Sequence, residues 1–235
     1  MSYEKTENLI TTYRERSLHS LLKKDVCPDD SKHELKIGRY VADACDGEEI
    51  FEIQTGNLKP LAKKLQYYIE NTDHQISIVR PIAQNKKIFW VDESGEIKKA
   101  PRTSSRHESI CHGISDLYYI KEFIGNGRIS FCFVLMEIDE IRLLDGYGKN
   151  KKVRATSVDK IAGDIYSRIC IKNEEDIANV VLPLLPDSPF SREEMSSAFR
   201  LKGIKLWSIQ KLLLELGLIT SSKEGRRLIF EKVER

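Results

Sequence analysis

The clearest alternation of apolar and polar positions predicts a strand in which Phe51 and Ile53 share one face while Glu52 and Gln54 share the other. An Asp-Gly pair at residues 46–47 comes just before this strand. Asp-Gly between alternating segments is a strong signal for a tight turn that joins two antiparallel strands. The pattern therefore predicts a β-hairpin.

The segment before the turn is expected to form one strand over residues 33–44, and Asp43 stands in it between Ala42 and Ala44. A lone carboxylate in so apolar a strand is costly to bury unless it has a partner. The hairpin places Asp43 beside Glu52, and two carboxylates supply oxygen ligands of the kind that Mg²⁺ or Mn²⁺ prefers. The alternative is a solvated hairpin with ordinary surface acids.

Asp43 followed by Glu52-Ile53-Gln54 resembles the PD-(D/E)xK nuclease superfamily, which has the restriction-endonuclease-like fold. In that superfamily an Asp on one strand is followed by Glu-x-Lys on the next, around a magnesium site. The longer string, with ERSLH before it and VRPI after it, resembles an uncharacterised bacterial branch with a winged-helix tail. The resemblance covers residues 10–82 and implies that Asp43 and Glu52 bind Mg²⁺ or Mn²⁺. Gln54 departs from the usual Lys, although some restriction enzymes carry Gln there and remain active.

Two further acids are candidates for the same site. A helix is predicted over residues 4–24, and Glu15 and His19 share one of its faces because they are four residues apart. The resemblance implies that the first helix supplies an acid, which would be Glu15, with His19 orienting a phosphate or a water. A surface pair is the alternative. Glu34 precedes Asp43 by an odd number of residues, so it joins the metal site only if a bulge intervenes.

The segments that follow repeat the order expected of the nuclease fold. Residues 57–71 are predicted to form a helix, and residues 75–82 form a nearly all-apolar strand typical of a buried position after a crossover helix. A second hairpin is expected at residues 86–97 and a buried strand at 128–136. Residues 158–169 are assigned to a helix.

A polar stretch at residues 98–107 is expected to form a loop, with Arg102 and Arg106 available to contact phosphate. A solvated loop without a ligand is the alternative.

The C-terminal segment predicts a separate small domain. Ser191 and Glu194 form a capping box that starts a helix, a second helix follows at residues 204–216, and two short strands flank the turn SSKEGR. This order resembles a winged helix-turn-helix domain, which implies that the second helix enters the major groove and the hairpin contacts the backbone. Protein docking is the alternative. The candidate nucleic-acid contacts here are Lys202, Lys205, Lys211, Lys223, Arg226 and Arg227.

The expected architecture is α/β, with a restriction-endonuclease-like mixed sheet flanked by helices in residues 1–182 and a winged-helix domain in residues 187–235. Residues 151–235 hold 16 Lys and Arg against 12 Asp and Glu, which is compatible with nucleic acid. No run approaches the ~18 apolar residues of a membrane span. The five scattered cysteines predict reduced thiols and a cytoplasmic protein.

Two functions follow from these patterns. The first is a Mg²⁺-dependent endonuclease that hydrolyses duplex DNA. Whether the chain forms a homodimer is left open by the sequence. The second is a non-catalytic DNA-binding or regulatory protein on a nuclease-like scaffold, which Gln54 leaves open. The convergence of Asp43, Glu52 and one further acid would separate the two.

Overall fold

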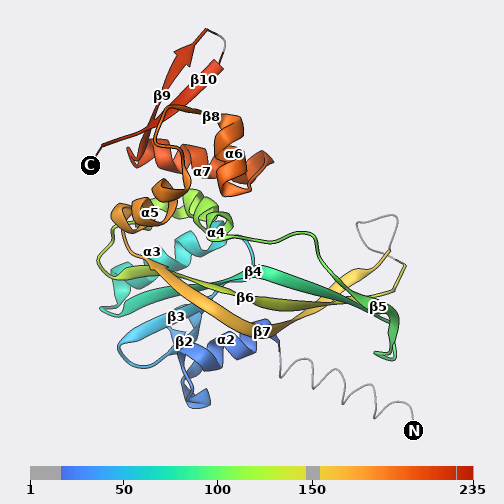
Figure 1. Ribbon diagram of the computed structural model, residues 1–235. Coiled ribbons are helices and arrows are strands. Elements are labelled where there is room, and N and C mark those ends of the chain that lie inside the picture. The colour runs from blue at the N-terminus through green and yellow to red at the C-terminus, as the bar shows by residue number, and fades with distance from the viewer. Residues whose placement is uncertain (1–16, 147–153, 226, 235) are drawn as a thin grey trace.

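The computed structural model describes residues 17–146, 154–225 and 227–234 (Figure 1). Its main sheet has the strand order β1-β2-β3-β4-β6-β7, with β5 paired to the far half of β4. The strands are β1 (His33–Ile37), β2 (Tyr40–Cys45), β3 (Glu49–Ile53), β4 (Gln75–Val91), β5 (Ile97–Thr103), β6 (Ile129–Leu143) and β7 (Thr156–Ile171).

The helices of this part are α2 (Leu18–Val26), α3 (Ala62–Asn71), α4 (Ile110–Leu117) and α5 (Glu174–Val181). Short 3-10 turns are η1 (Asp30–Lys32), η2 (Lys59–Leu61), η3 (Tyr118–Phe123) and η4 (Leu182–Leu184). The pairs β3–β4 and β4–β6 are parallel and the other neighbouring pairs are antiparallel. The expected mixed sheet flanked by helices is therefore confirmed.

Alternation along β4 divides the core between the two faces of the sheet. Ile78 and Ile82 point into a large core under α3 and α4, while Val79 and Ala83 point toward α2. Figure 1 shows α3, α4 and α5 on one side of the sheet and α2 on the other. Because successive side chains of a strand point to opposite faces, β4 belongs to both cores at once.

The C-terminal module consists of β8 (Phe190–Ser191), α6 (Arg192–Phe199), α7 (Gly203–Glu215), β9 (Ile219–Glu224) and β10 (Arg227–Lys232). The predicted capping box is present, since the Ser191 hydroxyl accepts the Glu194 amide and the Glu194 carboxylate accepts the Ser191 amide. The three strands pair in the order β8-β10-β9. Buried residues of α7 share one hydrophobic cluster with those of α3 and α4.

Three of the expected elements differ in the structure. The single strand over residues 33–44 is instead β1 and β2, because the chain reverses at Gly38, whose φ of +58° suits glycine. Most of the polar stretch at 98–107 is not a loop but the exposed strand β5. Residues 158–169 are not a helix but part of β7. Register shifts along the β6–β7 ladder interrupt simple alternation, so the apolar spacing in β7 resembles a helical period.

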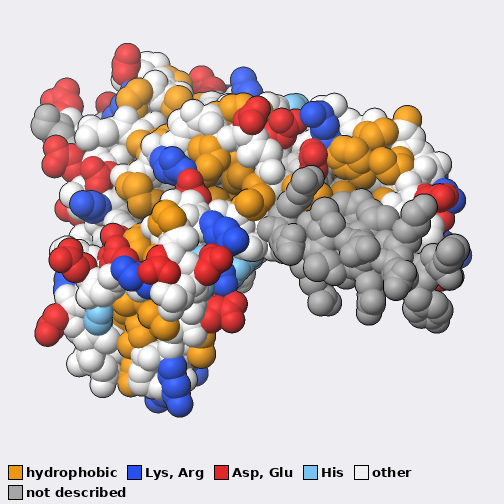
Figure 2. Space-filling model, turned by 90° about the horizontal axis from the view of Figure 1, so that it is seen from below, with side chains coloured by type: hydrophobic (Ala, Val, Ile, Leu, Met, Phe, Trp, Pro, Cys, Tyr) orange, Lys and Arg blue, Asp and Glu red, His pale blue; other side chains and the backbone are white. Residues whose placement is uncertain are grey.

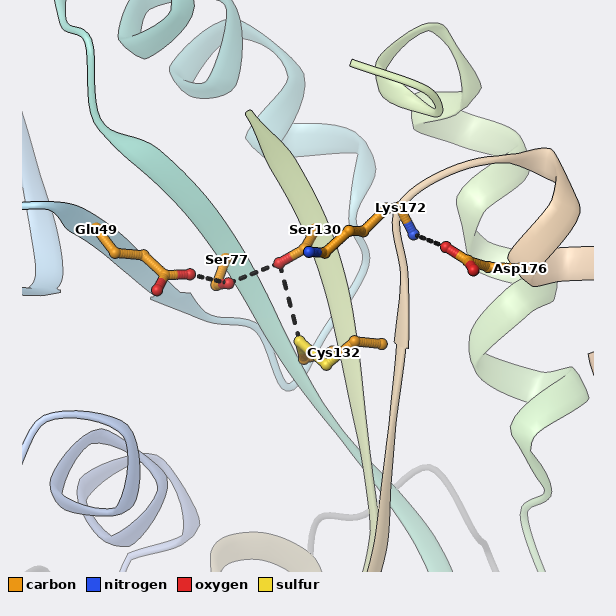
Figure 3. Close-up of a disulfide and its surroundings, with 7 residues drawn as sticks. Glu49, Ser77, Ser130, Cys132, Lys172 and Asp176 are labelled. Atoms are coloured by element: carbon orange, nitrogen blue, oxygen red, sulfur yellow. Dashed lines mark hydrogen bonds between the residues drawn. A yellow bond between two sulfur atoms is a disulfide. The ribbon is translucent and has the colours of Figure 1, made fainter. Parts of the chain in front are cut away.

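The prediction of reduced thiols is wrong for one pair of cysteines. Cys132 of β6 and Cys170 of β7 face each other across the ladder and form a disulfide (Figure 3). The alternation of β6 and β7 predicts neither partner, because the pairing depends on the register of two strands that bring together cysteines 38 residues apart in the sequence. Cys27, Cys45 and Cys111 are free and buried. Of the described helices, none has the length and apolarity needed to cross a membrane.

Gly113 allows α4 to lie close against the sheet. A Cβ atom at this position would come within 2.5 Å of the Phe133 ring and 2.9 Å of Ile82. We expect Gly113→Ala to lower the free energy of unfolding by about 1–3 kcal/mol, because an overpacked core must shift its side chains or backbone. Urea denaturation measures the change. The control is Gly127→Ala, where nothing lies within 4 Å of the added Cβ; equal stability of the two variants would contradict the prediction.

Candidate active site at the fork between β2 and β3

Asp43 stands where the β2–β3 ladder ends. The last paired residues are Ala44 with Phe51, so the antiparallel register places Asp43 opposite Glu52. At this point the strands separate, and Asp43 Oδ2 accepts a hydrogen bond from the Ile53 amide at 2.7 Å. The carboxylate thus takes the place of a backbone carbonyl and satisfies a donor that the fork would leave unpaired. The predicted hairpin and the predicted proximity of Asp43 and Glu52 are both present.

His19 approaches the same carboxylate from the face of the sheet that α2 covers. It lies in the first turn of α2, which Ser17 caps by accepting the Ser20 amide. Its Nε2 is 3.4 Å from Asp43 Oδ2. Burial opposes ionisation of Asp43, but the hydrogen bonds from His19 and from the Ile53 amide hold its pKa below the ordinary value.

Glu52 is almost fully buried and is neutralised by α3. Its Oε2 is 2.6 Å from Lys64 Nζ, and its Oε1 accepts a hydrogen bond from the Tyr68 hydroxyl at 3.0 Å. Burial raises the pKa of Glu52, and the Lys64 ammonium offsets part of that rise. Burial and the neighbouring carboxylate also raise the pKa of the Tyr68 hydroxyl. A carboxylate, an ammonium and a phenol therefore meet on the α3 side, where Glu52 lies opposite Asp43 in register.

Lys64 is the residue of this site that the sequence motif does not identify. It lies on the stripe formed by Leu61, Leu65 and Tyr68, at spacings that put all four on the buried face of η2 and α3. A lysine within an apolar helical stripe needs a buried partner, and this was the available signal. The Gln54 side chain instead donates to the carbonyl of Asn57 at 2.8 Å, within its own loop.

The other two candidate acids do not join Asp43 and Glu52 in the described chain. Glu34 occupies the register position opposite Asp43 on β1, but its side chain is 74% exposed and pairs with Lys23 at 2.8 Å. The odd spacing was expected to place Glu34 and Asp43 on opposite faces, which is wrong because the chain reverses at Gly38 and sets the two residues on neighbouring strands. Glu15 lies outside the described residues. Within residues 17–146, 154–225 and 227–234, no three His, Cys, Asp or Glu side chains form a metal-binding group.

A cavity of about 260 Å³ lies beside the His19 end of the site. It opens between the start of α2, the loop after β3 and the first residues of β7. Its wall combines hydroxyl groups, a lysine and the Asp159 carboxylate with apolar side chains. The lining residues are Ser17, Leu18, His19, Thr55, Ser157, Val158, Asp159 and Lys160.

The candidate nucleic-acid contacts lie on two distant parts of the molecule. Arg102 and Arg106 are exposed on and just after β5, which Figure 1 places at the end of the sheet away from the C-terminal module. In that module Lys202, Lys223 and Arg227 are exposed, Lys211 is half-buried, Lys205 is paired with Asp116, and Arg226 is outside the described residues. Figure 2 shows basic and acidic side chains interspersed on the face seen from below.

These features define an α/β protein with a mixed sheet flanked by helices and paired carboxylates at a strand fork. The chain belongs to the family described as "Domain of unknown function (DUF8091)", whose model matches residues 16–172. This match covers the main sheet and all the described residues of the candidate site, and it ends before α5. Neither the curated proteins nor the solved structures include a match to the chain.

Because the pKa of Asp43 is lowered in the folded protein, the free energy of unfolding should depend on pH in the acid range. The ordinary value is 3.8, so the unfolded chain binds this proton more tightly than the folded chain does. The stabilisation is complete above the unfolded-state pKa and is lost as the pH falls through the folded-state pKa. We expect wild type to be more stable than Asp43→Asn at about pH 6 and this advantage to shrink toward about pH 3.

Urea unfolding of both proteins across this range measures the difference in free energy. The exposed neighbour Glu48, changed to Gln, serves as the control for loss of an acid from the same hairpin. A stability difference between wild type and Asp43→Asn that stays constant with pH would contradict the assignment.

Proposed function

We propose that this protein is a metal-dependent nuclease that hydrolyses DNA phosphodiester bonds with Mg²⁺ or Mn²⁺. The observation that carries the proposal is that Asp43 lies opposite Glu52 in register at the fork between β2 and β3, where Lys64 pairs with Glu52. The order of elements supports it, because antiparallel strands, a helix and a parallel strand succeed one another as the restriction-endonuclease-like resemblance implies, with three antiparallel strands where two were expected.

The donor chemistry of the fork fits a divalent cation. Asp43 and Glu52 offer carboxylate oxygens, and Mg²⁺ is commonly held by one or two carboxylates together with waters and substrate phosphates. These two residues would hold the ion. A bound divalent cation would neutralise phosphate charge and lower the pKa of an attacking water.

The chain's own residues supply the remaining functions. The Lys64 ammonium offsets the cost of ionising buried Glu52 and provides the positive charge that Gln54 lacks. His19 fixes the Asp43 carboxylate, and its partly exposed ring borders the cavity, where its imidazolium form would donate to a phosphate oxygen from the second ring nitrogen. Gln54 would orient water only after leaving its hydrogen bond to Asn57.

Duplex binding is proposed for the C-terminal module as a winged helix. Its order of β8, α6, α7 and the β9–β10 hairpin supports this assignment. The α7 helix packs on α4 and η3, with the Trp207 and Tyr118 rings 5.0 Å apart between centroids. We therefore assign backbone contact to the exposed hairpin, which carries Lys223 and Arg227, rather than to α7.

Two further expectations belong to this proposal. A DNA substrate is compatible with a cytoplasmic location. In the cytoplasm, cellular thiols would reduce the Cys132–Cys170 disulfide. A homodimer would let two such sites cut both strands of a duplex.

One observation favours the second candidate, a non-catalytic DNA-binding protein on the same scaffold. The described residues bring two acids to the fork rather than three, and Glu52 is already neutralised by Lys64. Such a protein would bind duplex DNA through the hairpin without turnover.

Cleavage of supercoiled plasmid with Mg²⁺ or Mn²⁺ tests the enzyme proposal. We expect wild type to nick the plasmid and a chelator to stop it. Asp43→Asn, Glu52→Gln and Lys64→Met should each reduce the rate by about 100-fold or more, because the first two remove a carboxylate that would hold the ion and the third removes the ammonium beside Glu52. Glu48→Gln, in the same hairpin but exposed, should retain the wild-type rate.

Circular dichroism of each variant separates lost chemistry from lost folding. A wild type that retards duplex DNA in a gel without cutting it would support the non-catalytic candidate. Cleavage of RNA with no cleavage of DNA would overturn the proposed substrate.

A further inference from the structure

A buried ion network joins the C-terminal module to the main sheet. Asp116 of α4 is 6% exposed, and its two carboxylate oxygens have different partners. Oδ2 accepts from the Arg80 guanidinium on β4, and Oδ1 accepts from the Lys205 ammonium on α7. One carboxylate therefore connects three elements that are far apart in the sequence.

Arg80 extends this network to the loop that follows Glu52. Its Nη1 donates to the carbonyl oxygen of Gln54 at 3.3 Å and to that of Gly56. In the loop between β3 and η2, residues 55–57 are exposed, whereas the Gln54 amide donates to the Val79 carbonyl and Leu58 is buried. The same loop contributes Thr55 to the cavity beside His19. By its bond to the Gly56 carbonyl, the guanidinium thus restrains the exposed middle of the loop next to the candidate site.

The network is sensitive to the loss of any member. Arg80 is half-buried, with a side chain 14% exposed, and its Nε has no hydrogen-bond partner in the structure as described. Its position depends on Asp116 and on the loop carbonyls. Removing one partner from a buried ion pair leaves the other charge uncompensated, and the local structure must rearrange to bring in water or another partner.

We infer that Arg80 is a positioning residue for the site at the fork, and that Lys205 of the C-terminal module acts on it through Asp116. Docking of α7 sets the conformation of the loop at residues 54–57 by this route. The module is then a working part of the site rather than a tethered binding domain. The catalytic meaning of this inference rests on the proposed nuclease function, whereas the coupling itself does not.

A second ion pair across the same interface provides a matched control. Lys121 of η3 is 2.5 Å from Glu215 of α7, and both side chains are about two-fifths exposed. This pair also links the main part to α7, but it contacts neither Asp116 nor Arg80. Lys121→Met therefore removes one lysine from the interface and leaves the network intact.

Amide hydrogen exchange of the full chain tests the coupling. We expect Lys205→Met to speed exchange in the peptide covering residues 54–58 by about tenfold, at the Gln54 amide that donates to the Val79 carbonyl, because local opening becomes easier. Lys121→Met should leave that peptide at the wild-type rate, and Lys205→Arg should restore most of the protection. An unchanged loop in Lys205→Met, or an equal change in Lys121→Met, would overturn the inference.

Asp116→Asn covers the case in which Lys205→Met detaches the module. This variant replaces the carboxylate with an amide of the same size and so removes the negative charge that holds Arg80 and Lys205 together. Faster exchange at residues 54–58, with α7 still protected, would support the coupling. A loop that keeps its wild-type protection would contradict it.

Kinetics then separate this inference from the proposed function. If wild type cleaves DNA, Lys205→Met should lower kcat by about tenfold with KM for DNA unchanged, because positioning rather than binding is lost. An inactive wild type whose loop still responds to Lys205→Met would reject the nuclease and retain the coupling. An active wild type in which Lys205→Met changes neither the exchange of the loop nor kcat would retain the nuclease and reject the coupling.

Discussion

The central physical constraint in this fold is the ionised carboxylate of Asp43 at the point where β2 and β3 separate. Its hydrogen bond from the Ile53 amide ends the ladder without leaving a buried donor unpaired. His19 of α2 contacts this carboxylate, and Glu52, which lies opposite it in register, is held by Lys64 of α3.

Neutralisation of buried acids determines how the helices attach to the sheet. Glu52 is compensated by Lys64 of α3, and Asp116 of α4 is compensated by Arg80 and Lys205. A buried charge is tolerated only where partners are placed with good geometry, so these contacts fix each helix in one position relative to the sheet. The same charges that a nuclease would use on phosphate are therefore also part of the architecture.

Local patterns predict the local parts of this structure. The turn at residues 46–47, the alternation of Phe51 and Glu52, and the capping box at Ser191 are each set by neighbours in the chain, and each is present. Gly38 was available as a signal for a turn, but its positive φ is a property of the backbone that the residue type only permits.

What the sequence does not predict depends on pairing between distant segments. The roles of Lys64 and Lys205 follow from which helix packs on which strand, and the disulfide follows from the β6–β7 register. Strand β7 has apolar residues at helical spacing because irregular pairing with β6 shifts its alternation. In each case tertiary packing overrides the local pattern.

Calorimetric titration of Mn²⁺ into the full chain tests the central claim most directly. The account predicts that wild type binds the ion, that the double variant Asp43→Ala with Glu52→Ala does not, and that Glu48→Ala binds as wild type does. Circular dichroism of the double variant shows whether it is folded. Absence of binding by wild type up to millimolar Mn²⁺, in the presence of duplex DNA, would contradict a metal-dependent site at the fork.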